Sequence, residues 1–283
     1  MTRSSTLLPV VLAMTAIVPA AQSSAPVAFR LDSQGSILVP VQIAGGEPIL
    51  FVLDTGSSRS AISQRVAARL GATVVGQSEV ISSGRPAVRP LVRLPTLTVK
   101  HMQKSGLLAT VLDSSELRAI AGRADGILGM DFLGHHRYTL DYRNKLLLWD
   151  GSSVAGSRNS VQLQARWSEG RCLVALPQKA GGRPLWLLAD SGADTLVLFR
   201  QRGVLRTVPL GQWATLDTAG GRLFVNRLLV PELKLGELRL RNLPAVELPV
   251  NRDRSAGDGL LPLRLFAQVY FDPASNSMTI VPR

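Results

Sequence analysis

Apolar and polar positions alternate along the first part of the chain in the manner of β-strands. Residues Ser36 to Ile43 alternate loosely, and Gly45-Gly46 supplies a turn. The run from Ile49 to Leu53 is apolar at every position, which is typical of a strand buried on both faces. We therefore predict a hairpin whose second strand lies in the core and ends directly before Asp54.

The same pattern predicts a chain of strands and turns with little helix. Residues Ser63 to Leu70 are expected to form a short helix that ends at Gly71. Further strands are expected as a hairpin over Glu79–Val92, a strand over Leu94–Val99 and two strands over Tyr138–Trp149. Residues 151–160 are rich in Gly, Ser and Asn, so we predict a linker there.

The chain contains an internal repeat. The triplet Asp54-Thr55-Gly56 returns 136 residues later as Asp190-Ser191-Gly192, again directly after an apolar run. At the same offset and without a gap, the turn region Gln42–Pro48 matches Gln178–Pro184 in its Gln, Ala, Gly-Gly and Pro positions. One such triplet alone is weak evidence, but matched turns and strands in the same order indicate a duplication.

A second matched unit extends the repeat to nearly all of the chain after its first residues. Asp125-Gly126-Ile127-Leu128 corresponds to Asp258-Gly259-Leu260-Leu261, at an offset three residues shorter. We therefore expect a signal peptide at residues 1–21, an N-terminal lobe at 22–150, the linker at 151–160 and a C-terminal lobe at 161–283.

A motif with one acid per copy predicts that the two acids meet on a pseudo-two-fold axis. Carboxylates within hydrogen-bonding reach cannot both ionise cheaply, so Asp54 and Asp190 are expected to share a proton. Such a pair can hold a water molecule, take a proton from it with one carboxylate and donate a proton to a carbonyl oxygen with the other. This chemistry is peptide hydrolysis without a covalent intermediate. The alternative is that each acid only stabilises its own turn.

These motifs resemble the pepsin and retropepsin family of aspartic proteases, in the secreted bacterial form with two fused lobes. Asp54–Ser58 is similar to the pepsin-type motif, and Asp190–Thr195 is similar to the retroviral one. Ile127-Leu128-Gly129 is similar to the family's apolar-apolar-glycine element, which packs beneath each catalytic loop. The resemblance implies a mainly β fold of two homologous β-barrel lobes related by a pseudo-two-fold axis, with few short helices.

The resemblance also implies roles for particular residues. Asp54 and Asp190 would be the catalytic carboxylates. The residues that would brace the two loops are Thr55, Ser191, Gly56, Gly192 and Ser57. Thr55 and Ser191 would do so through crossed hydroxyl-to-backbone hydrogen bonds, and the glycines would let the backbone approach the acids. Ser57 would hydrogen-bond the outer oxygen of Asp54, which Ala193 cannot do for Asp190.

Flaps that close over bound peptide are implied around the two hairpin tips. The candidate substrate-binding residues there are Ser83, Gly84, Ala219 and Gly220. Asp194 joins them because its retroviral counterpart contacts the substrate backbone, although an ion pair with a nearby arginine is an equal alternative. Trp213 precedes the second flap and is expected to pack in the core or at an edge, or to line a pocket.

Three features depart from the family pattern. Pro262 stands where the second copy of the apolar-apolar-glycine element has its glycine, so the packing beneath Asp190 is expected to differ. The three tyrosines all lie in later strands, so neither flap carries the pepsin-type tyrosine. No long propeptide separates the signal from the first strand, so zymogen activation of the pepsin kind is not expected.

The first residues predict export. Arg3 supplies a positive charge, Leu7 to Val18 is mostly apolar, and Pro19-Ala20-Ala21 offers small residues for cleavage. A membrane anchor is the alternative, although the apolar run is shorter than a spanning helix needs. Cys172 is the only cysteine, which excludes a disulfide scaffold and places the residue in a buried strand. We expect a bacterial periplasmic or secreted protein.

Charge and the remaining polar residues exclude other classes. The formal net charge is +12, but the arginines are scattered without interleaved aromatic residues, so nucleic-acid binding is not expected. Three histidines with no carboxylate cluster predict no metal, and no cofactor is expected. Asp125 and Asp258 each precede a glycine and are expected to cap a turn or a short helix.

The sequence thus predicts an exported aspartic endopeptidase whose partner is a peptide or protein substrate. It is expected to be a monomer in which the two copies form an intramolecular pseudo-dimer. The rival is a binding protein of the same fold that holds a peptide or protein without cutting it. Both acids and both bracing hydroxyls favour the enzyme, whereas Pro262 and the missing flap tyrosine favour the rival.

Overall fold

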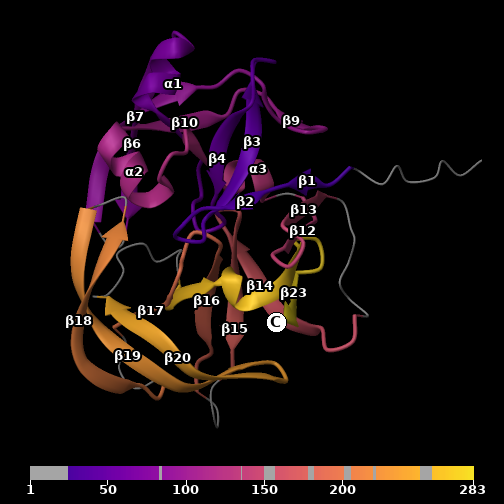
Figure 1. Ribbon diagram of the computed structural model, residues 1–283, viewed down its shortest axis with the longest axis vertical. Helices are drawn as coiled ribbons and strands as arrows, with labels where there is room; N and C mark the ends of the chain where they lie inside the picture. The colour runs from indigo at the N-terminus through magenta and orange to yellow at the C-terminus, as the bar shows by residue number, and fades with distance from the viewer. Residues whose placement is uncertain are drawn as a thin grey trace, which may run out of the picture.

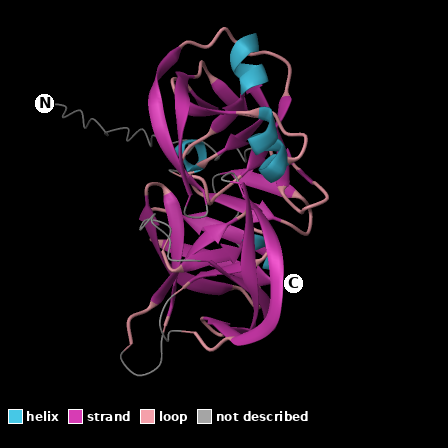
Figure 2. Cartoon of the chain, turned by 90° about the vertical axis from the view of Figure 1, so that its left-hand side faces the viewer, coloured by secondary structure: helices cyan, strands magenta, loops and turns pink. Residues whose placement is uncertain are grey.

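The computed structural model describes residues 25–82, 85–134, 136–149, 157–177, 182–200, 205–218, 221–248 and 257–283. These residues form a mainly β protein with three short α-helices, as predicted. The helices lie almost entirely in the half of the molecule that the first copy builds (Figures 1 and 2). The predicted signal peptide and most of the predicted linker lie outside the described residues.

The first copy contributes thirteen described strands and the three helices. The strands are β1 (Val27–Ala28), β2 (Arg30–Leu31), β3 (Ile37–Ile43), β4 (Ile49–Leu53), β5 (Ala61–Ser63), β6 (Val74–Ser82), β7 (Arg85–Arg93), β8 (Leu97–Val99), β9 (Met102–Lys104), β10 (Leu108–Leu112), β11 (Gly126–Leu128), β12 (Tyr138–Asp141) and β13 (Leu146–Trp149). The helices are α1 (Gln64–Arg69), α2 (Ser114–Ala121) and α3 (Met130–Leu133).

The second copy is built almost entirely of strands within the described residues. They are β14 (Val161–Ser168), β15 (Arg171–Leu176), β16 (Leu185–Asp190), β17 (Leu196–Phe199), β18 (Val208–Thr218), β19 (Gly221–Leu235), β20 (Leu238–Leu248), β21 (Gly259–Pro262), β22 (Phe266–Asp272) and β23 (Ser277–Pro282). A 3-10 turn, η2 (Leu263–Leu265), stands where the first copy has α3.

Each copy builds the same three-stranded unit beneath its acid. In the first copy β11 lies between β4, to which it is parallel, and β5, to which it is antiparallel. In the second copy β21 lies in the same way between β16 and β17. The consecutive residues Phe51, Val52 and Leu53 are all buried, so both faces of β4 are covered as the apolar run predicted. The acid therefore leaves the core at the end of a strand that is held on both edges.

The two copies join through one continuous sheet. Strand β12 of the first copy pairs antiparallel with β22 of the second, and Thr139 lies opposite Tyr270. These two residues occupy equivalent positions in the repeat, so a local pseudo-two-fold axis passes between them. Strands β13 and β1 extend the sheet on one side, and β23 and β14 extend it on the other.

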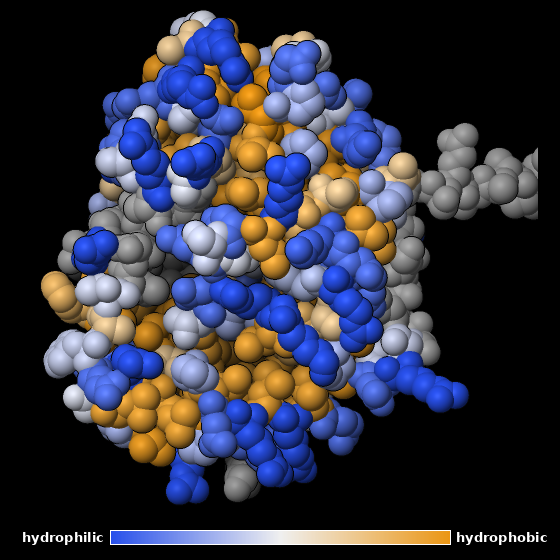
Figure 3. Space-filling view, in the orientation of Figure 1, coloured by the Kyte–Doolittle hydropathy of each residue, from blue (hydrophilic) through white to orange (hydrophobic). Residues whose placement is uncertain are grey.

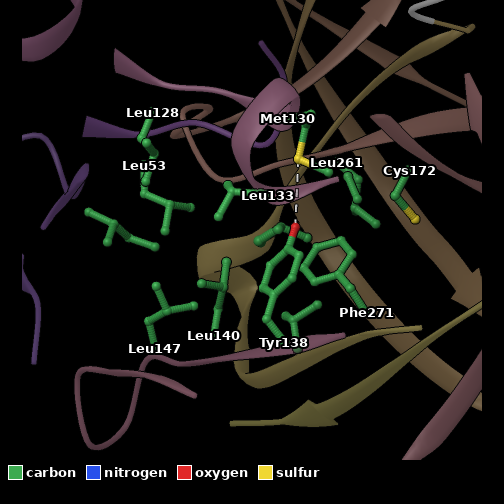
Figure 4. Packing of buried hydrophobic residues seen from close by; sticks show 14 of the residues in the cluster. Leu53, Leu128, Met130, Leu133, Tyr138, Leu140, Leu147, Cys172, Leu261 and Phe271 are labelled. Atoms are coloured by element: carbon green, nitrogen blue, oxygen red, sulfur yellow. Dashed lines mark hydrogen bonds between the residues drawn. The ribbon is translucent and has the colours of Figure 1, made fainter. Parts of the chain in front are cut away.

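Tyr138 and Phe271 of this shared sheet belong to one buried cluster with Leu53 and Leu261, which come from the strands beneath the two acids (Figure 4). Tyr138 is fully buried and stacks on Phe271 with 4.6 Å between ring centroids. Its hydroxyl donates to the Met130 sulfur at 3.7 Å. Burial of side chains this large stabilises the fold by roughly 1.5–3 kcal/mol each. Cys172 is buried in β15 as predicted, and burial raises the pKa of its thiol.

The structure departs from the predicted elements in the middle of the first copy. Only Leu97–Val99 of the predicted strand over Leu94–Val99 is a strand. Helix α2 was not predicted, although the sequence carries its signal. Asp113 caps the helix and Glu116 closes a reciprocal capping box with it.

The implied β-barrels are not found as closed sheets among the described residues. The strands instead form a thirteen-stranded and a ten-stranded sheet, each with an open order. No helix among the described residues combines the length and the apolar character needed to cross a membrane. Hydrophilic side chains are spread over the face shown in Figure 3, with apolar areas between them.

Candidate active site

The two acids stand at equivalent ends of equivalent strands. Asp54 directly follows β4, and its backbone N–H donates to the Leu128 carbonyl of β11 at 3.0 Å. Asp190 is the last residue of β16 and lies opposite Pro262 in the parallel pair with β21. Pro262 therefore does not disrupt the strand pairing beneath Asp190. The two copies differ directly after this strand, where η2 replaces α3.

Four crossed hydrogen bonds lock the two loops together. The Thr55 hydroxyl donates to the Ala189 carbonyl at 2.8 Å and accepts from the Ser191 N–H at 2.9 Å. The Ser191 hydroxyl donates to the Leu53 carbonyl at 2.8 Å and accepts from the Thr55 N–H at 3.0 Å. Both hydroxyls are buried, and each uses its donor and one acceptor site. The arrangement joins residues that are 136 positions apart in sequence, so neither copy completes it alone.

The two glycines let each loop approach the opposite acid. A Cβ atom built on Gly56 would lie 2.6 Å from the Asp190 carboxyl carbon. A Cβ atom built on Gly192 would lie 3.0 Å from Asp54 Oδ1 and 3.3 Å from Asp190 Oδ1. The first of these distances leaves no room for a side chain. Both carboxyl groups therefore crowd around the same small space next to Gly192.

Burial raises the pKa of both acids, and at Asp190 the negative charge of Asp54 raises it further. Desolvation is the main cause at Asp54, and it outweighs the N–H donors of Gly56 and Ser57. At Asp190 desolvation and the negative charge of Asp54 raise the pKa to about 8. The two carboxyl groups are also within hydrogen-bonding reach of each other. Asp190 therefore keeps its proton at neutral pH.

The carboxyl oxygens are held by backbone donors in both loops. The Gly56 N–H donates to Asp54 Oδ1 at 2.9 Å, and the Gly192 N–H donates to Asp190 Oδ1 at 2.7 Å. The Ala193 N–H adds a second bond to Asp190 Oδ1 at 3.1 Å. The implied role of the Ser57 hydroxyl is not what the structure shows. That hydroxyl donates to the Arg59 carbonyl at 2.8 Å and so closes its own turn.

Arg171 is a residue of the site that sequence reasoning missed. It begins β15, is 5% exposed, and its guanidinium donates to the Gly56 carbonyl at 3.5 Å and to Glu169 at 3.3 Å. Its positive charge partly opposes the rise in the pKa of Asp54. The matched position in the first copy is Gly35, so the repeat offered no signal for this arginine.

Asp125 and Asp258 are each paired with an arginine, a contact that the sequence interpretation did not include. Asp125 forms an ion pair with Arg65, and Asp258 forms one with Arg183 at 2.9 Å. The Asp258 carboxylate also accepts the Trp186 N–H at 2.9 Å. Both acids are tied into the strands and lie in structural rather than reactive positions.

The predicted flap hairpins exist, but their tips lie outside the described residues. Strands β6 and β7 pair down to Ser82 and Arg85, and β18 and β19 pair down to Thr218 and Gly221. The candidate residues Ser83, Gly84, Ala219 and Gly220 are therefore not placed. Asp194 is exposed, and its side chain makes no hydrogen bond or ion pair with the described part of the chain.

Trp213 is not a core residue, because its exposed fraction is 70%. It lies on β18 beside the exposed Phe224 of β19, whose strand partner is Thr215. A separate cavity of about 400 Å³ lies against α1 and α2 and contains neither acid of the pair. Across the described ranges, no three His, Cys, Asp or Glu side chains gather as metal ligands.

Comparison with known proteins identifies the family. A model of the aspartyl protease family matches residues 39–132 and 176–263, one match in each copy of the repeat. No curated protein matches the chain. The two matched regions together span more than half of the sequence, and each contains one of the paired acids. This chain therefore belongs to the aspartyl protease family.

Proposed function

We propose that this protein is an exported aspartic endopeptidase that cleaves peptide bonds with water activated between Asp54 and Asp190. The observation that carries the proposal is the pair of carboxyl groups, one from each copy, held around one small space by the crossed bonds of Thr55 and Ser191. Rigid placement of both groups is what acid–base catalysis needs.

The raised pKa of Asp190 divides the work between the acids. In the proposed mechanism Asp190, whose pKa is raised to about 8, carries the proton and Asp54 acts as the ionised base. A water molecule between them gives a proton to Asp54 as its oxygen attacks the peptide carbonyl, while Asp190 donates its proton to the carbonyl oxygen. The resulting gem-diol collapses when it returns a proton to Asp190 and the leaving nitrogen takes the proton from Asp54. The pair ends with one proton, as it began.

A catalytically silent binding protein is the second candidate. It is favoured by Pro262 and by the absence of tyrosine from the flap sequences. Pro262 weighs little, because the strand pairing beneath Asp190 is the same as beneath Asp54. All four crossed bonds and both acids are retained, which a protein without turnover does not require. The balance favours the enzyme.

Export and a peptide or protein substrate belong to the same proposal. The support for export is the sequence of the first 21 residues, with its positive charge, apolar run and small residues. A single chain supplies both acids, so the site needs no second copy, and we propose a monomer. The family match supports a peptide as the substrate.

A peptide-library digest tests the proposal. The mature protein and its Asp54→Asn variant are incubated with a diverse peptide library from pH 3 to pH 8, with and without a pepstatin-type inhibitor. We expect products from the wild type alone. Binding of peptides by both proteins with no cleavage by either would establish the silent binding protein instead.

A further inference from the structure

The loop that carries Asp54 is hydrogen-bonded to helix α3. The Met130 N–H donates to the Ser57 carbonyl at 2.9 Å, and the Asp131 N–H donates to the Ser58 carbonyl at 3.2 Å. The Asp131 carboxylate then reaches the end of the loop. Its Oδ1 accepts both the Ser60 hydroxyl at 2.6 Å and the Ser60 N–H at 2.9 Å.

Ser60 links the Asp131 carboxylate to Gly129, whose backbone packs against the Asp54 loop. Its hydroxyl oxygen accepts the Gly129 N–H at 3.1 Å while its proton goes to Asp131. A Cβ atom built on Gly129 would lie 2.6 Å from the Arg59 carbonyl carbon, so only glycine fits. Loop, glycine and α3 thus form one hydrogen-bonded unit around a single carboxylate.

Among the described residues, the Asp131 carboxylate is buried with only one of its two oxygens hydrogen-bonded. Its Oδ2 is buried and has no hydrogen-bond partner within the described part of the chain, and burial raises the pKa of Asp131. Lys104 lies nearby, and its Nζ donates to the Asp131 backbone carbonyl at 2.6 Å. Half-satisfied buried carboxylates cost stability. Asp131 therefore needs a reason to be there other than stability alone.

The second copy has lost every member of this unit together. Its matched positions are Leu196, Pro262 and Arg264, which offer no hydroxyl, no N–H at the glycine position and no carboxylate. Arg264 is exposed and turns instead to the Gln34 carbonyl at 2.7 Å. The unit therefore exists beneath Asp54 alone, although the rest of the two loops is nearly symmetric.

We propose that Asp131 is a positioning residue for Asp54, acting through Ser60 and the loop between them. The inference rests on the proposed peptidase function. The Asp131 carboxylate fixes the far end of the Asp54 loop. The Gly56 N–H then holds the Asp54 carboxylate, and Thr55 holds the opposite loop, in one geometry. Losing the anchor lets the ionised acid drift relative to the attacking water, which slows the chemical step without removing a substrate contact.

The test compares equivalent substitutions in the two copies. Asp131→Leu removes the anchor, Asp131→Asn keeps an oxygen that accepts from Ser60, and Arg264→Leu places the same leucine at the matched position of the second copy. We expect Asp131→Leu to lower kcat by up to about 100-fold with KM nearly unchanged. Asp131→Asn is expected to recover kcat to within about threefold of wild type, since the acceptor remains. Arg264→Leu is expected to leave kcat unchanged.

Amide hydrogen exchange gives a readout that does not depend on turnover. In Asp131→Leu the amides of residues 55–60 are expected to exchange about tenfold faster, while those of residues 191–196 keep their wild-type rates. Arg264→Leu is expected to change neither segment. If the wild type cleaves nothing, the peptidase proposal fails, and the exchange pattern alone still decides whether Asp131 holds the loop.

Several results would overturn the inference. Wild-type exchange of residues 55–60 in Asp131→Leu would show that the carboxylate does not hold the loop. A loss of kcat in Arg264→Leu as large as in Asp131→Leu would show a general packing effect. If Asp131→Leu does not fold, Ser60→Ala replaces it. That variant removes the hydroxyl bonds to Asp131 and from Gly129 and keeps only the Ser60 N–H bond to the carboxylate, so a smaller change of the same kind is expected. Unchanged kcat and exchange in that variant would show that the Ser60 hydroxyl does not transmit the anchor and would overturn the proposal.

Discussion

Replacing Asp190 by asparagine removes the carboxyl group that holds the shared proton, and the structure predicts how stability then depends on pH. Burial and the charge of Asp54 raise the folded-state pKa of Asp190 from 3.8 to about 8. Between these two values the folded protein keeps a proton that the unfolded chain has released. The stabilisation associated with Asp190 is therefore fully present below pH 4 and is lost as the pH rises toward 8.

The size of the effect depends on the width of that window. One proton changes the free energy of unfolding by about 1.4 kcal/mol per pH unit. Between pH 4.5 and pH 7.5 the wild type is therefore expected to lose up to about 4 kcal/mol through this pair, a large part of the 5–15 kcal/mol typical of a folded protein. Asp190→Asn cannot lose this proton, so its unfolding free energy is expected to change much less over the same range.

Urea unfolding followed by tryptophan fluorescence at pH 4.5 and pH 7.5 measures the difference. We expect the variant to be clearly more stable than the wild type at pH 7.5 and close to it at pH 4.5. Asp194→Asn, which changes an exposed acid four residues along the same loop, is the matched control and is expected to follow the wild type. An equal pH dependence in wild type and Asp190→Asn, or a less stable variant at pH 7.5, would refute the assigned pKa shift.

The same contacts give three further predictions. Thr55→Val removes the acceptor of the buried Ser191 N–H and is expected to cost about 1–3 kcal/mol of stability in urea unfolding and to abolish cleavage in the peptide digest. Gly129→Ala pushes a methyl group into the Arg59 carbonyl and is expected to cost about 1–3 kcal/mol in thermal unfolding, whereas Gly76→Ala, with open space around it, is expected to be harmless. The pH profile of kcat/KM is expected to be bell-shaped, falling on the alkaline side as the pair loses its shared proton, and a profile still rising at pH 9 would contradict the assignment.

Much of the fold was predictable because the duplication repeats local signals. Two apolar runs that each end at an acid, with turn glycines at matched offsets, determine the central strands and their order. Helix α2 was missed although its capping box, Asp113 with Glu116, is a local signal of the same kind. The open sheets were not predictable in this way, since closure depends on pairings between strands far apart in sequence.

In the candidate site, too, only the residues that the repeat marks were predictable from the sequence. Asp54 and Asp190 came from a motif, and their meeting came from symmetry. The contacts of Arg171, Ser60 and Asp131 did not, because each depends on how a separate segment of the chain packs against the acid loop, which no local pattern encodes. The motif also predicted the Ser57 hydroxyl on Asp54, where the structure shows it on a neighbouring carbonyl. The repeated motif therefore locates the two acids, whereas the residues that hold them in place become visible only in the packed structure.

Several differences between the copies bear on how each acid is held. Beneath Asp54 a polar unit centred on Asp131 ties the loop to a helix, whereas beneath Asp190 a proline without an N–H stands in place of Gly129. A symmetric pair has no intrinsic reason to keep its proton on one side. Deeper burial of Asp190 and the charge of Arg171 near Asp54 both favour the proton on Asp190. Once one acid stays ionised and the other protonated, the two loops have different tasks, and a duplicated chain, unlike a dimer of identical halves, can fit each loop to its own.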